Sequence, residues 1–232
     1  MQLEAPIERA QLIKRYKRFL ADVILADGRE VTAHCPNPGA MTGLAAPGMT
    51  VGLLPAANPK AKLPFRWELC FADGGWVGIN TGRPNRLAEE AVRSGVIAEL
   101  AGYDILRREV KYGRNSRIDL LLEDPGRPPC YVEIKNVHLK RRPGLAEFPD
   151  SVTARGAKHL AELAAVRAAG ARAVMLFIVQ RADCDTMSLA HDIDPRYAKA
   201  MTEARAAGVE VICYKCSLSE ENISVTQPLK VV

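Results

Sequence analysis

Two neighbouring runs of the chain carry acidic and basic side chains at a spacing that suits metal-dependent hydrolysis. Asp119 begins one apolar run, and Glu133 and Lys135 lie in the alternating run that follows it. Because a dense turn signal at 124–129 separates the runs, we predict that they are the two strands of a hairpin. The period of two along the second strand then places Glu133 and Lys135 on one face and Ile134 on the other.

This arrangement suits hydrolysis of a phosphodiester by a divalent cation. Carboxylates on neighbouring strands hold hard cations such as Mg²⁺ or Mn²⁺, so we predict Asp119, Glu133 and the main-chain carbonyl of Ile134 as metal ligands. Lys135 would orient or deprotonate the attacking water, or neutralise charge on the scissile phosphate. The alternative is a solvated face of cross-strand charges, which is the usual outcome for so short a motif.

A predicted helix at 153–169 carries a second polar set. Arg155, Lys158, His159 and Glu162 are spaced so that they share one helix face. We predict that Arg155 and Lys158 bind phosphate and that His159 positions a water or a product oxygen. An exposed amphipathic face with no partner is the alternative.

The first third of the chain shows short strand patterns and no evident helix. We therefore predict a small OB-like β-barrel over residues 1–82, with nucleic acid binding as its role. The segment 35–43 is too rich in proline and glycine for regular structure; it either connects strands or brings backbone amides close to a phosphate. The predicted strands of this barrel span 19–25, 30–34, 49–54, 65–72 and 76–80.

A basic cluster in the predicted barrel surrounds one aromatic ring. Lys14, Arg15, Lys17 and Arg18 flank Tyr16. On a small barrel, such residues form a platform for a single strand, with phosphate contacts around a stacking ring. A solvated strand face is an alternative of equal weight, so the cluster alone does not decide the function.

After residue 82 the pattern changes to helices alternating with strands, which predicts an α/β (α+β) domain with a mixed central sheet over residues 83–232. An apolar run at 171–180 is typical of a strand that is buried on both faces. We expect a loop at 140–150. The other predicted elements are a helix from 85, capped by Asn85, a strand at 105–112, the hairpin, helices at 153–169 and 195–207, and a strand at 209–216.

Composition permits a nucleic-acid partner without requiring one. The chain has 232 residues, of which 48% are hydrophobic, and a net charge of +5. No apolar run approaches the roughly 20 residues that span a bilayer, and the N-terminal segment lacks the apolar core of a signal peptide. We therefore expect a cytoplasmic protein with no membrane partner, with association with the nucleoid as an option. The oligomeric state is open, with a homodimer among the options.

The order of a helix, Asp119, Glu133-x-Lys135 and a second helix resembles the αβββαβ core of the PD-(D/E)xK nucleases. A longer resemblance, over nearly the whole chain, is to the sugar fermentation stimulation protein A family. That family implies an OB-type N-terminal domain, a PD-(D/E)xK nuclease-like C-terminal domain and DNA binding. The blocks that carry the resemblance lie at 13–23, 34–43, 85–92, 109–113, 116–122, 130–139 and 148–160.

The resemblance also implies roles for individual residues. Asp119 and Glu133 match the metal carboxylates, Lys135 matches the motif lysine, and Glu90 matches the helix acid that completes the catalytic set. Ile118 stands where the motif has a proline, which is a common departure. The family name implies a link to maltose metabolism and transcriptional regulation, which none of these residues shows.

Three functions follow from these observations. The leading hypothesis is a DNA-binding protein with a nuclease site that uses Mg²⁺ or Mn²⁺, with RNA as the alternative substrate. The second is a non-catalytic DNA-binding regulator of sugar metabolism that keeps the nuclease-like fold. The third is a small-molecule enzyme on the same fold, for which no glycine-rich phosphate loop is present.

Overall fold

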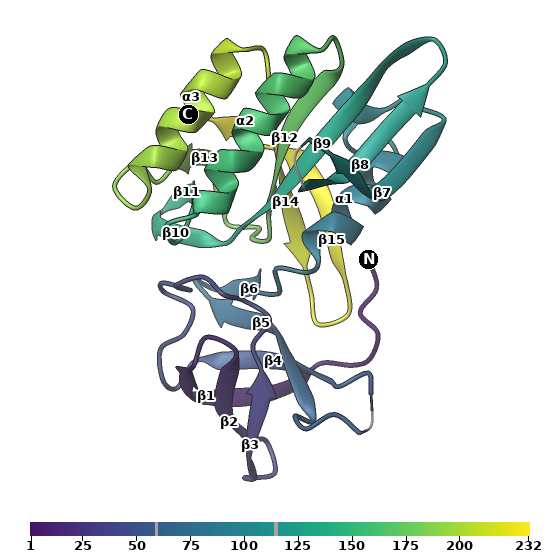
Figure 1. The fold of residues 1–232 in the computed structure, drawn as a ribbon. Helices are drawn as coiled ribbons and strands as arrows, with labels where there is room; N and C mark the ends of the chain where they lie inside the picture. The colour runs from purple at the N-terminus through teal and green to yellow at the C-terminus, as the bar shows by residue number, and fades with distance from the viewer. Residues whose placement is uncertain (59, 114–115) are drawn as a thin grey trace.

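The computed structural model describes residues 1–58, 60–113 and 116–232 and shows two stacked domains (Figure 1). In the first, pairing of β1 with β2 and β4, β2 with β3, and β5 with β4 and β3 closes a five-stranded barrel. The predicted OB-like barrel is thus confirmed. Its strands are β1 (Glu8–Tyr16), β2 (Leu20–Leu25), β3 (Glu30–His34), β4 (Thr50–Pro55) and β5 (Phe65–Ala72), and β6 (Gly75–Gly78) extends the sheet beyond β5.

The second domain is built on a mixed six-stranded sheet in the order β15-β14-β12-β9-β8-β7. The strand β12 is parallel to both of its neighbours, and the remaining pairs are antiparallel. This is the predicted α/β nuclease-like domain. Its elements are α1 (Pro84–Arg93), the 3-10 helix η1 (Ala98–Leu100), β7 (Ile105–Tyr112), β8 (Ser116–Asp124), β9 (Arg127–Val137), α2 (Ala154–Ala168), β12 (Arg172–Val179), α3 (Pro195–Ala206), β14 (Glu210–Leu218) and β15 (Ile223–Pro228).

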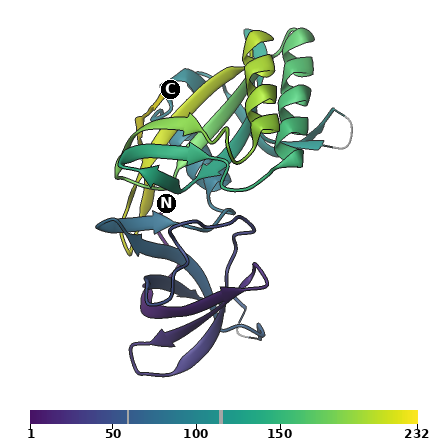
Figure 2. The same cartoon turned by 90° about the vertical axis from the view of Figure 1, so that its left-hand side faces the viewer.

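Strand β12 is buried on both faces, as its continuous apolar sequence predicts. Val174 and Leu176 face a core shared with α1, whereas Met175 and Phe177 face a core shared with α2 and α3. Figure 2 shows α2 and α3 side by side along one face of the sheet. The odd positions of β9, including Glu133, therefore lie on the side that α2 covers.

Local sequence signals set the helix boundaries. The Thr153 side chain accepts a hydrogen bond from the Gly156 amide (3.1 Å) at the start of α2. The buried Asp194 caps α3 through the Tyr197 amide (2.9 Å), and its second oxygen accepts from the Thr153 amide (2.7 Å). One carboxylate thus joins the starts of both helices. The helix α1 begins instead with Pro84, and Asn85 is not its cap.

The predicted loop at 140–150 is wrong in part, because this segment forms two strands of a second sheet. β10 (Leu139–Arg142) and β11 (Gly144–Phe148) pair with each other, and β11 continues to β13 (Cys184–Leu189) and β16 (Lys230–Val231). These strands are short, and pairing over long sequence distances stabilises them, so local sequence carries little signal for them. Within the described ranges, no helix is both long and apolar enough to cross a bilayer.

The junction between the domains is charged and buried. Glu68 on β5 is fully buried and accepts hydrogen bonds from Asn80 (2.8 Å) and Arg83 (2.9 Å), and it also pairs with Arg66. The chain start returns to the second domain, where Met1 and Leu3 pack into the core under α1. The strands of the barrel sheet therefore end before residue 82 and those of the other two sheets follow it, although the first residues of the chain pack on the second domain.

Candidate metal and nucleic-acid site

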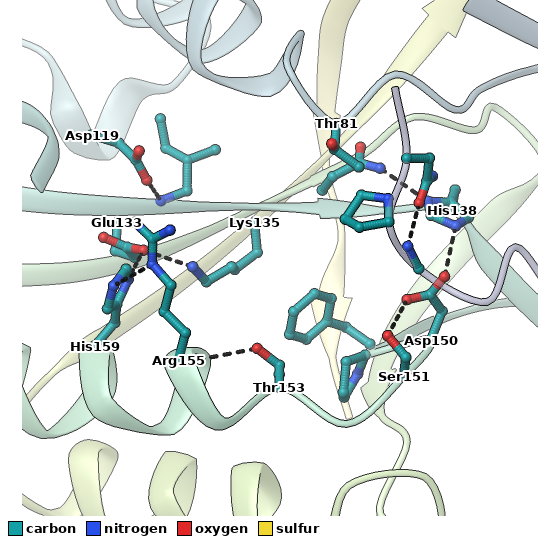
Figure 3. Close-up of a pocket in the computed structure, with 18 of the residues that line it drawn as sticks. Thr81, Asp119, Glu133, Lys135, His138, Asp150, Ser151, Thr153, Arg155 and His159 are labelled. Carbon is teal, nitrogen blue, oxygen red and sulfur yellow. Dashed lines mark hydrogen bonds and ion pairs between the residues drawn. The ribbon is translucent and has the colours of Figure 1, made fainter. Parts of the chain in front are cut away.

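A cavity of about 550 Å³ lies where the two domains meet, and Figure 3 shows its lining. The barrel contributes its β1–β2 turn and the loop before β4, and the second domain contributes β8, β9, the segment before α2, and α2 itself. The polar lining residues include Arg18, Asn37, Thr81, Asn85, Glu109, Asp119, Glu133, Lys135, Asn136, His138, Asp150, Ser151, Thr153, Arg155 and His159.

The predicted hairpin brings Asp119 and Glu133 onto one face. Leu120 pairs with Val132, so Asp119 and Glu133, the next residues on the two strands, lie on the same side of the sheet. Asp119 Oδ2 accepts a hydrogen bond from the Ile134 amide (2.7 Å), and its Oδ1 accepts from Asn85 Nδ2 of α1 (2.8 Å). Two hydrogen bonds therefore fix the orientation of this carboxylate.

Glu133 is only 2% exposed and lies at the centre of the predicted set. Its Oε1 accepts hydrogen bonds from Lys135 Nζ (2.6 Å) and from His159 Nδ1. His159 Nε2 in turn accepts from Arg155 Nε (3.2 Å), which assigns the neutral ring a proton on Nδ1. Four side chains predicted from the sequence thus form one connected group (Figure 3).

This environment shifts the pKa values of the two carboxylates in opposite directions. Burial raises the pKa of Asp119, and the nearby charge of Glu133 adds to the rise, against the hydrogen bonds from Ile134 and Asn85. Burial alone would also raise the pKa of Glu133, but the contacts with His159 and Lys135 outweigh it and hold that pKa below its usual value. Glu133 is therefore ionised at neutral pH, and Asp119 is the easier of the two to protonate.

The donor set fits a hard cation, although it is small. Among residues 1–58, 60–113 and 116–232, no group of three His, Cys, Asp or Glu side chains is placed to hold a metal. Two carboxylates are available, and Glu133 Oε2 is buried with no hydrogen-bond partner in the same described ranges. A buried anionic oxygen without a partner is costly unless a cation or water satisfies it. Together with the predicted carbonyl of Ile134, this gives an all-oxygen site.

Two other predicted residues lie away from this group. Glu90 pairs with the Met1 amine (2.8 Å) and Arg86 (3.1 Å), and it is not among the described residues that line the cavity. Lys158 is largely exposed and pairs with Glu162 (3.7 Å) one turn along α2. The structure therefore places neither residue where the sequence predicted it to act. Asn85, one turn earlier on α1 than Glu90, reaches the carboxylates instead.

The basic cluster on the barrel is also arranged differently from the predicted platform. Tyr16 donates its hydroxyl hydrogen bond to Asp22 (3.1 Å), and Lys14 covers the Tyr16 ring (5.4 Å to its centroid). Arg15 donates to main-chain carbonyls of the loop 35–43. Lys17 and Arg18 form the exposed β1–β2 turn, and of the five residues only Arg18 lines the cavity.

A second polar group, missed by the sequence analysis, lies at the barrel end of the cavity. The Asp150 carboxylate contacts His138 Nε2 (3.2 Å) and accepts from the Met41 amide of the barrel (3.1 Å). Burial opposes ionisation of Asp150, but the contact with His138 outweighs it and lowers the pKa to about 2. No local residue spacing signalled this group, because Asp150 and Met41 come from distant parts of the chain.

Asp150 should make the free energy of unfolding depend on pH in the acid range. A carboxyl whose pKa falls from about 4 to about 2 on folding stabilises the protein by about 2 kcal/mol above pH 4, and this is lost as pH falls toward 2. We expect Asp150→Asn to lack this component. The unfolding free energies of the wild-type and Asp150→Asn proteins, measured with urea, should therefore converge as the pH falls from 4 to 2. A constant difference in unfolding free energy across that range would contradict the assignment.

Comparison with known proteins agrees with this architecture. The model described as "Sugar fermentation stimulation protein RE domain" matches residues 82–222, and that described as "SfsA N-terminal OB domain" matches residues 13–79. Sugar fermentation stimulation protein homologs from Maricaulis maris and Paramagnetospirillum magneticum are 58% and 59% identical to this chain. These matches cover 100% and 99% of the chain and 98% and 97% of the relatives.

A solved structure also resembles the whole chain. The structure described as Pyrococcus furiosus SfsA in complex with Ca²⁺ superimposes with a TM-score of 0.90 at 27% identity. The match covers 100% of this chain and 98% of that one. Both domains, and their connection, are therefore shared with that protein.

Proposed function

Because this chain belongs to the sugar fermentation stimulation protein family, we propose that it binds nucleic acid and hydrolyses phosphodiester bonds with a divalent cation. One observation carries the proposal: Glu133 is a buried, ionised carboxylate with one oxygen unpartnered among the described residues, across the hairpin from Asp119 and bonded to Lys135. A carboxylate used only for structure would be expected to have partners on both oxygens.

The proposed metal ligands are Asp119, Glu133 and the carbonyl of Ile134. Mg²⁺ or Mn²⁺ bound there would act as a Lewis acid on the phosphate and lower the pKa of a bound water. The Ca²⁺ in the related Pyrococcus furiosus structure supports a hard-cation site in this fold.

The side chains around Glu133 and Asp119 would bind the phosphate or orient the two carboxylates. Lys135 holds a positive charge beside the carboxylates, where it would hydrogen-bond a phosphate oxygen or the attacking water. Arg155 extends from α2 into the cavity and would bind a second phosphate oxygen. The hydrogen bond from His159 keeps Glu133 ionised and oriented, whereas the hydrogen bond from Asn85 orients Asp119 and opposes the rise in its pKa.

The test combines metal binding with cleavage. Mg²⁺, Mn²⁺ or Ca²⁺ should raise the melting temperature of the protein, and Asp119→Ala should abolish the rise, because a ligand of the folded state stabilises it. Labelled DNA and RNA should be cut with Mg²⁺ or Mn²⁺ and remain intact with EDTA. Cleavage that persists in EDTA, or a metal-induced shift that Asp119→Ala leaves unchanged, would contradict the site.

A non-catalytic DNA-binding regulator is the second candidate. The observation that favours it is the small donor set, since the described residues place no third His, Cys, Asp or Glu with Asp119 and Glu133 to hold a metal, and one Glu133 oxygen is already bonded to Lys135 and His159. The same assay separates the two functions. Tight binding of DNA with no cleavage in any metal would support the regulator.

A further inference from the structure

The groups that would act on a phosphodiester lie deep in the cavity. Glu133 is 2% exposed and His159 is 4% exposed, and only Arg155 of the connected group is exposed. A phosphate that reaches these groups must enter the cavity. Its volume, about 550 Å³, is within the range of small-molecule pockets, roughly 300–1,000 Å³. That space is large enough for an unpaired nucleotide.

The barrel side of the cavity is held in place by hydrogen bonds. Arg15 donates to the carbonyls of Asn37 (2.7 Å) and Gly39 (2.9 Å), and Asn37 donates to the Ile79 carbonyl (2.8 Å). From the second domain, Asp150 accepts from the Met41 amide (3.1 Å). The loop 35–43 is therefore bonded to both domains and forms a fixed wall of the cavity.

An exposed aromatic pair on the barrel begins at the residue after Arg18. Arg18 lines the cavity, and the next residue, Phe19, is 46% exposed. The ring of Phe19 stacks on that of His34, with 6.4 Å between centroids and 26° between planes. A basic side chain followed by an exposed ring is the combination that proteins use to bind unpaired bases.

We infer that the cavity takes an unpaired nucleic-acid strand, which runs from the carboxylates past Arg18 to bases stacked on Phe19. The inference rests on the proposed function for the chemistry, but the path itself concerns binding alone. Enzymes that act on a base in a deep pocket use single strands or remove the nucleotide from the duplex, and we extend this argument to a phosphodiester whose proposed catalytic groups are buried. The substrate class is therefore single-stranded or frayed nucleic acid, in preference to intact duplex.

Fluorescence anisotropy tests the inference without requiring cleavage. A labelled single-stranded oligonucleotide and its blunt duplex are titrated with the protein in EDTA. We expect the single strand to bind more tightly, and Phe19→Ala to weaken its binding by about 10-fold, the size of one lost base stack. Phe71→Ala is the matched control, because Phe71 is 44% exposed beside Trp76 and is not among the described residues lining the cavity.

The outcomes separate the inference from the proposed function. Equal or tighter binding of the blunt duplex, or equal losses in Phe19→Ala and Phe71→Ala, would overturn the unpaired-strand path. Preferential binding of the single strand that depends on Phe19, with no cleavage in Mg²⁺ or Mn²⁺, would support the path and overturn the nuclease. Cleavage confined to the unpaired arm of a forked substrate would support both.

Discussion

Replacing Glu133 by glutamine should reduce phosphodiester hydrolysis by about 10³-fold or more while the fold is kept. A bound metal contributes several kcal/mol to stabilising the transition state, and each 1.4 kcal/mol is about tenfold in rate. The substitution preserves the size of the side chain and an oxygen for Lys135 and His159, but it removes the charge that Asp119 alone cannot replace. Single-turnover cleavage of a labelled strand measures the effect.

Glu90→Gln is the control for this experiment. The family resemblance assigns Glu90 to the site, whereas the structure pairs it with the Met1 amine and Arg86. Glu90→Gln should therefore cleave at nearly the wild-type rate. If it lost activity to the same degree as Glu133→Gln, with an unchanged melting temperature, the position of α1 relative to the carboxylates would have to be revised.

Replacing Glu68 by alanine should destabilise the protein by about 3–5 kcal/mol, the cost of removing one partner of a buried ion pair. Glu68 is fully buried and satisfies Arg66, Arg83 and Asn80 at the junction of the domains. Its loss would leave the nearly buried Arg83 with the partly exposed Glu4 as its remaining carboxylate partner. Urea unfolding monitored by circular dichroism measures the change.

The matched variant is Glu30→Ala, which removes an exposed glutamate from another strand of the same barrel. Exposed substitutions of this kind change stability by about 0.5 kcal/mol or less. Equal effects of the two variants would show that the buried charges at the junction contribute little to holding the domains together.

Sequence reasoning located the parts of this protein that depend on local pattern. Alternation and turn signals identified the strands β2 to β6 and the hairpin, but not β1, and the continuous apolar run identified β12. Residue spacing also placed Glu133 beside Lys135 on one strand and Arg155 beside His159 on one helix face. The two pairs meet through His159 and Glu133, because α2 covers the face of β9 that carries Glu133.

The features that the sequence did not reveal depend on contacts between distant segments. Asn85 was expected to cap α1, but its amide bonds Asp119 across 34 positions of the chain. Asp150 accepts a hydrogen bond from Met41 across 109 positions of the chain, and the short strands β10, β11 and β13 are stabilised by pairing with one another. Arg15 is similar: its sequence context is that of a phosphate ligand, and only the folded loop 35–43 shows that its donors are occupied.

The carboxylate of Asp194, which bonds the starts of both α2 and α3, couples the positions of these two helices. Because the Thr153 and Tyr197 amides share this one buried acceptor, a shift at the start of α3 would weaken the hydrogen bond at the start of α2. His159 and Arg155 lie on α2, so the placement of the proposed site depends on a side chain that is not among the described residues lining the cavity.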